Sequence, residues 1–388
     1  MATMPEPAVA AEESVRSRIG AAHRVVVKVG SSSLTTPEGG LAPSRLQRLV
    51  DALADARDRN REVVLVSSGA IATGLMPLGL QERPRDLATQ QAAASVGQGL
   101  LVAHYTRRFL ERGYTVGQVL LTEDDVVRRG QYRNANRTLT RLLELGVVPI
   151  INENDTVASQ EIRFGDNDRL AALVAHLVRA DALILLSDVD ALYTDHPANP
   201  GARRIAEVRD PQDLLGVDTS RIGSRVGTGG MTTKVEAAQI ATSAGIPVLL
   251  TNADQCVEAL AGGDVGTCFH VTGRRRGARQ LWVAHATRAE GDLVIDAGAA
   301  RALTERDASL LPVGITEVRG DFHEGDPVNI VDPDNLVIAR GLAGFDADDL
   351  RRMKGLTTAR LLDTLGPDFG GTAVHKDALV VLPRARPL

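Results

Sequence analysis

A chain of 388 residues is long for one ordinary domain and fits two, each large enough to bury its own core. Its 44% hydrophobic and 24% charged residues are typical of a soluble globular protein, and no apolar run approaches the roughly 20 residues that span a bilayer. The formal net charge of −5 argues against a protein that coats nucleic acid, so nucleic acid is not an expected partner. The N-terminus lacks a basic start followed by an apolar block, so we expect a flexible tail over residues 1–21 and a cytoplasmic protein.

Short β-branched runs alternate with longer helical patterns along the first part of the chain. The expected strands are Arg24–Val29, Glu62–Ser67, Tyr114–Leu121, Val147–Ile151, Asp181–Leu186 and Ile246–Leu250. The expected helices are Pro43–Asn60, Asp86–Arg112, Asn134–Leu145, Asn167–Arg179 and Thr232–Ala244. Apolar strands that alternate with helices form a mostly parallel sheet covered on both faces. We therefore predict an α/β fold, a three-layer αβα sandwich with a mostly parallel central sheet, whose ligands bind beyond the carboxyl ends of the strands.

Small residues, amides and carboxylates follow these expected strands. The segments are KVGSSSL, SSGAIATG, INENDTV, RFGDNDRLAA, LLSDVDALY and GTGGMTTK, which begin at Lys28, Ser67, Ile151, Arg163, Leu185 and Gly227. Small residues let backbone N–H groups approach a phosphate, and a following helix N-terminus adds a favourable dipole. Taken singly, the first two segments also fit tight turns, and the acidic clusters also fit helix N-caps. Because GTGGMTTK does not fit the G-x-x-x-x-G-K-[ST] spacing, a Walker-type NTPase is disfavoured.

Lysine is rare in this chain, and its positions are informative. Of the 44 basic residues only Lys28, Lys234, Lys354 and Lys376 are lysines. An ammonium group is a compact point charge, which suits a single phosphate oxygen better than the planar fork of arginine does. Since Lys28 and Lys234 lie in the glycine-rich and hydroxyl-rich segments, they are candidates for phosphate contacts.

Cysteine and histidine chemistry is not expected. Cys256 and Cys268 are too few for a disulfide framework and are not spaced as a metal knuckle. The eight histidines form no metal-spaced or triad-like cluster. We therefore expect two ordinary buried thiols and no protein metal site.

Taken together, these segments resemble the amino-acid kinase family over roughly residues 22–270. The pair NEND and GDND, followed by SDVDALY and TGGMTTK, is similar to the members that phosphorylate the side-chain carboxylate of L-glutamate in proline biosynthesis. Within the C-terminal part, LWVAHATRAEGDLVIDAGAARAL and SLLPVGITEVRGDFHEGDPVNIVD resemble a PUA domain, a small β pseudo-barrel typical of those members. The resemblance implies a catalytic domain over residues 22–270, a linker over 271–279, a PUA-like domain over 280–355 and a C-terminal extension over 356–388.

The resemblance also distributes roles among individual residues. It implies that Lys28 and Lys234 contact the transferring phosphoryl group and that Asp168 holds both lysines in position. Ser68, Asp155 and Asn167 match the positions that bind the amino-acid substrate. The residues that match the ATP site are Lys28, Gly30, Ser187, Asp188, Thr228, Gly229, Gly230, Met231, Thr232, Thr233 and Lys234. The family often has threonine where this chain has Ser187, a departure that keeps the hydroxyl.

The chemistry of such a reaction agrees with this set of residues. A carboxylate nucleophile with a pKa of about 4.3 is already ionised at neutral pH, so no general base is needed. ATP and Mg²⁺ are the expected cofactors, with the metal held largely by nucleotide oxygens and waters. Asp155 is the best candidate partner for the α-amino group of the substrate. The resemblance further implies a homo-oligomer, a tetramer or a dimer, and feedback inhibition by proline.

Two alternatives remain open at this level. The chain could be another kinase of the same family, which acts on N-acetylglutamate or aspartate. It could instead be an RNA-binding regulatory protein that uses its PUA-like domain, although the net acidity and the 3% aromatic content argue against that.

Overall fold

The computed structural model describes residues 14–36, 40–122, 125–126, 129–157, 167–195, 199–214, 217, 230–273, 289–306 and 308–382. The chain divides into two compact units, with the boundary near residue 275. The domain limits expected from the sequence stay a prediction. None of the helices in these ranges has the length and apolarity needed to span a bilayer.

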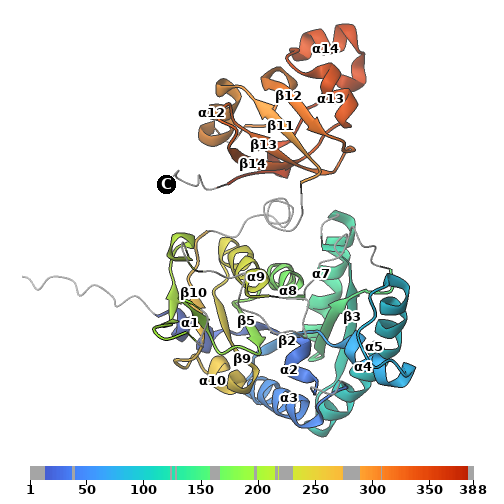
Figure 1. Ribbon diagram of the computed structural model, residues 1–388, viewed down its shortest axis with the longest axis vertical. Helices are drawn as coiled ribbons and strands as arrows, with labels where there is room; N and C mark the ends of the chain where they lie inside the picture. The colour runs from blue at the N-terminus through green and yellow to red at the C-terminus, as the bar shows by residue number, and fades with distance from the viewer. Residues whose placement is uncertain are drawn as a thin grey trace, which may run out of the picture. The chain divides into compact units, whose positions relative to one another are not determined.

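The N-terminal unit is built on an eight-stranded sheet (Figure 1). The strand order is β3 (Val116–Leu121), β4 (Val148–Glu153), β2 (Glu62–Ser67), β1 (Arg24–Val29), β5 (Ala182–Ser187), β9 (Val248–Asn252), β10 (Thr267–Phe269) and β8 (Glu207–Val208). The first six strands run parallel, and β10 is antiparallel to β9. The central strands are buried along nearly their whole length because helices cover both faces of the sheet. The predicted mostly parallel sheet is confirmed.

Helices cover both faces of this sheet. In Figure 1, α8 (Asn167–Leu177) and α9 (Met231–Ser243) lie on one face, and α3 (Pro43–Asp58) and α10 (Cys256–Leu260) lie on the other. Further helices among the described residues of this unit are α2 (Ser31–Leu34), α4 (Ala70–Leu75), α5 (Leu87–Glu111) and α7 (Arg129–Glu144). Helix α7 begins at Arg129, before the predicted Asn134. Its first residues are mostly polar, so hydrophobic periodicity did not reveal this start.

A further helix, α1 (Val15–Ala21), lies within the stretch that we expected to be a flexible tail. Its Ile19 is fully buried in the main apolar core. The guanidinium of Arg61 donates to the carbonyls of Ile19, Ala22 and Leu260, so it ties the end of α1 to α10. A helix of two turns has too few residues to show a clear periodicity, and these tertiary contacts stabilise it instead.

The two cysteines are core residues. Cys256 and Cys268 are both free and buried in the N-terminal unit. Burial raises the pKa of the Cys256 thiol to about 12 and that of Cys268 to about 11, so both remain protonated thiols at neutral pH.

The C-terminal unit has its own five-stranded sheet and its own apolar core. The strand order is β12 (Ile315–Gly320), β11 (Gly291–Ile295), β13 (Pro327–Val331), β14 (Val337–Leu342) and β15 (Leu379–Val381), with helices α12 (Ala297–Arg306), α13 (Ala347–Met353) and α14 (Thr358–Thr364). Strand β15 pairs with β14, so part of the expected C-terminal extension is a strand of this sheet.

Candidate active site

Polar side chains gather at one edge of the N-terminal sheet, where its parallel strands end. The register of β1 places Val29 level with Ser67 of β2 and Leu186 of β5, so the loops that follow start side by side. The residues at these strand ends include Gly30, Ser68, Asn152, Asp155, Ser187 and Asp188. This edge is where open α/β sheets bind their ligands, as the sequence predicted.

Lys28 lies beneath α8. Side chains alternate between the two faces of a strand, and Val27 and Val29 belong to the main apolar core, so Lys28 points to the opposite face. There its Nζ lies 2.5 Å from Oδ1 of Asp168, and only 2% of the residue is exposed. The side chain of Lys28 therefore places a buried positive charge against α8, the helix that covers β1.

Asp168 lies in the first turn of α8 and is fully buried between two lysines. Its Oδ2 accepts a hydrogen bond from Nζ of Lys234 in α9 at 3.1 Å, and the hydroxyl of Thr233 lies 3.4 Å from the same oxygen. The three ionised side chains together carry one net positive charge. Buried charges need partners of good geometry, and a phosphate oxygen is a suitable further partner for two ammonium groups.

A salt bridge joins the two helices that carry these groups. Nε of Arg169 in α8 donates to Oε2 of Glu236 in α9 at 3.0 Å, and the Nη2 atom of Arg169 contacts the same oxygen. Arg169 directly follows Asp168, and Glu236 lies two residues after Lys234. The pair therefore helps to keep the carboxylate and the second lysine together.

A tight turn after β2 presents Ser68. Gly69, at φ +105°, adopts a left-handed conformation that glycine reaches without a steric penalty, and α4 begins at the next residue. The side-chain amide of Asn167, the first residue of α8, donates to Oγ of Ser68 at 2.9 Å and to Oδ1 of Asn152 at 2.8 Å. Two of the three residues expected to bind the substrate thus contact each other, although the sequence places them far apart.

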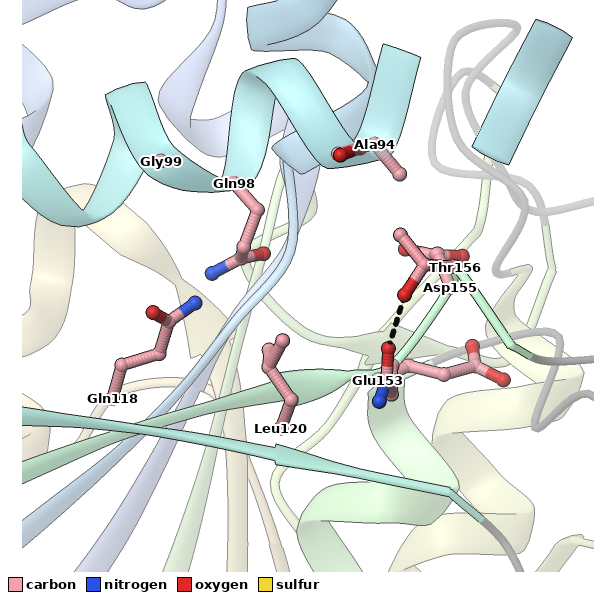
Figure 2. Close-up of a pocket in the computed structure, with 10 residues that line it drawn as sticks. Ala94, Gln98, Gly99, Gln118, Leu120, Glu153, Asp155 and Thr156 are labelled. Carbon is pink, nitrogen blue, oxygen red and sulfur yellow. Dashed lines mark hydrogen bonds between the residues drawn. The ribbon is translucent and has the colours of Figure 1, made fainter. Parts of the chain in front are cut away.

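A pocket of about 320 Å³ lies beside this group. Figure 2 shows Gln98 reaching into it from α5 and Gln118 and Leu120 reaching into it from β3. Its other side is formed by Glu153 at the end of β4 and by Asn154, Asp155 and Thr156 of the loop that follows. Two carboxylates and several amides line the pocket, so it favours a ligand that carries an ammonium group.

Comparison with known proteins agrees with this fold. The model of the amino acid kinase family matches residues 23–252, and the model of the PUA domain matches residues 291–365. The glutamate 5-kinase of Streptomyces coelicolor is 61% identical over 368 residues, which are 95% of this chain and 98% of that protein. This chain belongs to the glutamate 5-kinase family. The predicted family resemblance is confirmed.

Other similar proteins include the glutamate 5-kinase of Thermobifida fusca, which is 56% identical over 369 residues, 95% of each chain. Among solved structures, carbamate kinase from Giardia lamblia bound to AMP-PNP is 19% identical with a TM-score of 0.48, and the match covers 65% of this chain and 99% of that one. Members of a kinase family use ATP as the phosphoryl donor.

The residues that the glutamate 5-kinase resemblance matched to ATP lie at the end of β1, at the end of β5 and at the start of α9. At the end of β5, Oγ of Ser187 donates to Oδ1 of the neighbouring Asp188 at 3.0 Å. At the start of α9 lie Gly230, which caps the helix, and Met231 to Lys234. Gly30 follows Lys28 closely: a Cβ added to it would lie 3.9 Å from Nζ of Lys28. Thr228 and Gly229 lie outside the described residues, and the role of each of these residues in this glutamate 5-kinase family member stays a prediction.

Sequence reasoning missed two side chains at this site. Asn152 is part of the INENDTV segment but had no role assigned to it, and its Nδ2 donates to Oε1 of Gln98 at 2.6 Å. Gln98 lies in the middle of a long helix, where one glutamine among many polar residues carries no sequence signal. Only the packing of α5 against the end of β4 reveals it.

Proposed function

We propose that this chain catalyses the ATP-dependent phosphorylation of the side-chain carboxylate of L-glutamate, giving L-glutamyl 5-phosphate, the first step of proline biosynthesis. Membership of the glutamate 5-kinase family supports the reaction and the substrate. The observation that carries the catalytic assignment is the buried Lys28–Asp168–Lys234 cluster at the carboxyl edge of the sheet.

The cluster supplies what this reaction requires. A glutamate carboxylate oxygen attacks the γ-phosphorus of ATP, the bond between that phosphorus and the β–γ bridging oxygen breaks, and ADP leaves with the electron pair. No proton has to move, because the nucleophile is already ionised. The difficulty is to bring an anion against a triphosphate, and two fixed ammonium groups stabilise the charge on the phosphoryl oxygens. Asp168 keeps both groups in place through its two oxygens.

Substrate recognition requires the opposite polarity at the α-amino group. Asp155 lines the pocket between α5, β3 and the end of β4, and it is the proposed partner of the ammonium group. Ser68 and Asn167, which share a hydrogen bond, are the proposed contacts to the rest of the amino acid.

Mg²⁺ is proposed to accompany ATP. Within the described residues no group of three or more histidine, cysteine, aspartate or glutamate side chains could hold a metal ion. Since magnesium keeps waters and binds phosphate oxygens readily, an ion bound mainly by the nucleotide agrees with the donors present. When bound, it would neutralise charge on the phosphates.

We also propose, by family resemblance, a cytoplasmic homo-oligomer, either a tetramer or a dimer, that proline inhibits at the glutamate site. A sedimentation experiment and a proline titration of the reaction test these two proposals separately.

The reaction is tested by coupled ADP release with glutamate, aspartate and N-acetylglutamate side by side. We expect a clear preference for glutamate, because an acetylated substrate offers no ammonium group to Asp155 and aspartate is one methylene shorter. A preference for aspartate or N-acetylglutamate would support one of the two alternative kinases and contradict the assignment to glutamate.

Replacing Asp155 by asparagine tests the substrate site. We expect the KM for glutamate to rise about 10- to 100-fold, since a hydrogen bond to a charged group contributes about 1.5–3 kcal/mol, and the KM for ATP to change little. Steady-state kinetics with each substrate varied in turn measures both values.

The matched control is Asp58→Asn, which makes the same change in an exposed ion-pair cluster of α3 with Arg112 and Tyr114. It should leave both KM values near those of the parent protein. A selective loss of ATP affinity in Asp155→Asn would place this residue in the nucleotide site and refute its role.

A further inference from the structure

A line of hydrogen bonds between polar side chains crosses from α5 to the proposed substrate site. Oε1 of Gln98 accepts from Nδ2 of Asn152, and Oδ1 of Asn152 accepts from Nδ2 of Asn167. The same Nδ2 of Asn167 also donates to Oγ of Ser68. We name these four residues the amide relay. Gln98 and Asn152 are only 9% and 3% exposed, so water competes little for the bonds between them.

Each amide in the relay has one orientation that fits its partners, because an amide donates from its NH₂ group and accepts at its oxygen. The NH₂ group of Asn167 donates both its hydrogens within the relay, one to Asn152 and one to Ser68. Its Oδ1 is buried and has no hydrogen-bond partner among the described residues. A buried acceptor without a partner is costly, and a ligand that donates a hydrogen bond removes that cost. The α-ammonium group of glutamate is such a donor.

Gln98 is the acceptor at the far end of the relay. Because its Oε1 accepts from Asn152, the Nδ2 of Asn152 faces α5 and its Oδ1 faces Asn167. If Asn152 were turned over, its NH₂ would meet the NH₂ of Asn167, and two donors would oppose each other. Asn167 would then have to turn as well, and it would present an NH₂ group rather than an oxygen to the substrate's ammonium group.

Gln98 also lines the pocket that Asp155 lines from the opposite side (Figure 2). The same side chain therefore borders the space for the ligand and orients the amides beside it. We propose that Gln98 is a positioning residue that, through Asn152, turns the carbonyl oxygen of Asn167 toward the α-ammonium group and so contributes to selectivity for an amino acid. This inference rests on the proposed function, because it takes glutamate as the substrate.

The experiment compares Gln98→Met, which keeps the shape but removes the acceptor, with Gln98→Glu, which keeps an acceptor for Asn152. ADP release gives the KM for glutamate and for ATP. Inhibition by glutarate, the same dicarboxylic acid without the amino group, gives an inhibition constant. Gln47→Met is the matched control, since Gln47 is a half-buried glutamine of α3 that donates to Asp51 and lies outside the pocket and the relay.

In Gln98→Met we expect the KM for glutamate to rise about tenfold or more, because one buried polar group is then misplaced. The KM for ATP and the inhibition constant for glutarate should each stay within about threefold of the parent value. Gln98→Glu should restore the KM for glutamate to within about threefold of the parent value, and Gln47→Met should change it no more than that. If Gln98→Met does not fold, Gln98→Leu replaces it in the same comparison.

Three results would overturn the inference. The first is an unchanged KM for glutamate in Gln98→Met. The second is an equal loss of glutamate and glutarate binding, which would show that the whole pocket is loosened. The third is a Gln98→Glu variant whose KM for glutamate rises as much as that of Gln98→Met. Failure of the proposed function is seen separately, because the unsubstituted protein would then release no ADP with glutamate.

Discussion

Lys28→Arg and Lys234→Arg are each expected to lower kcat about a hundredfold or more, although both substitutions keep the positive charge. The ammonium groups lie 2.5 Å and 3.1 Å from the two oxygens of one buried carboxylate, and neither lysine is more than 7% exposed. A longer, planar guanidinium cannot occupy the same position, and misplacing a charge by about 1 Å can cost roughly a hundredfold in rate. Steady-state ADP release measures kcat, and ATP binding should weaken less than turnover falls.

Lys354→Arg and Lys376→Arg provide the matched controls. Both lysines are exposed in the C-terminal unit, and exposed substitutions usually change stability by no more than about 0.5 kcal/mol. Thermal unfolding of all four variants separates loss of catalysis from loss of fold. Turnover near that of the parent protein in a folded Lys28→Arg or Lys234→Arg variant would refute a role for these lysines at the phosphoryl group.

Gly97→Ala is expected to destabilise the N-terminal unit by about 3 kcal/mol or more. Helices α4 and α5 cross with their backbones in contact: a Cβ on Gly97 would lie 1.8 Å from the carbonyl oxygen of Ala70 and 2.5 Å from the nitrogen of Gly74. Overpacking costs about 1–3 kcal/mol where side chains can yield, and here the obstacle is backbone. Denaturant-induced unfolding followed by circular dichroism measures the loss.

The control for this substitution lies two residues away in the same helix. Among the described residues nothing lies within 4 Å of a Cβ added to Gly99. Gly99→Ala should therefore stabilise the protein by about 0.5–1 kcal/mol, since alanine is the better helix former. A Gly97→Ala protein as stable as the parent would show that the two helices do not depend on this close crossing.

The close crossing of α4 and α5 also positions two residues of the proposed site. Ser68 lies two residues before α4, and Gln98 directly follows Gly97 in α5. Separating the two helices would move both residues, so a partly folded Gly97→Ala protein should also bind glutamate poorly.

Much of this architecture could be predicted from the sequence because it is locally encoded. The central strands are continuous apolar runs, and all six predicted strands are present with ends within two residues of those expected. The scarcity of lysine and the family resemblance selected Lys28, Asp168 and Lys234, and the structure brings the three together. These strands and motifs can be recognised in the sequence because each depends only on the residue types within one short segment.

The sequence by itself determined the mostly parallel sheet, the two-unit organisation and the membership of a kinase family, since periodicity and motifs are local properties. Only the tertiary structure decided that α1 packs on the core, that β15 pairs with β14 in the C-terminal sheet and that Gln98 accepts a hydrogen bond from Asn152. Each of these depends on a contact between segments far apart in the chain. A helix of two turns, a three-residue strand and one glutamine have no sequence pattern of their own, and their roles arise only from the neighbours that folding gives them.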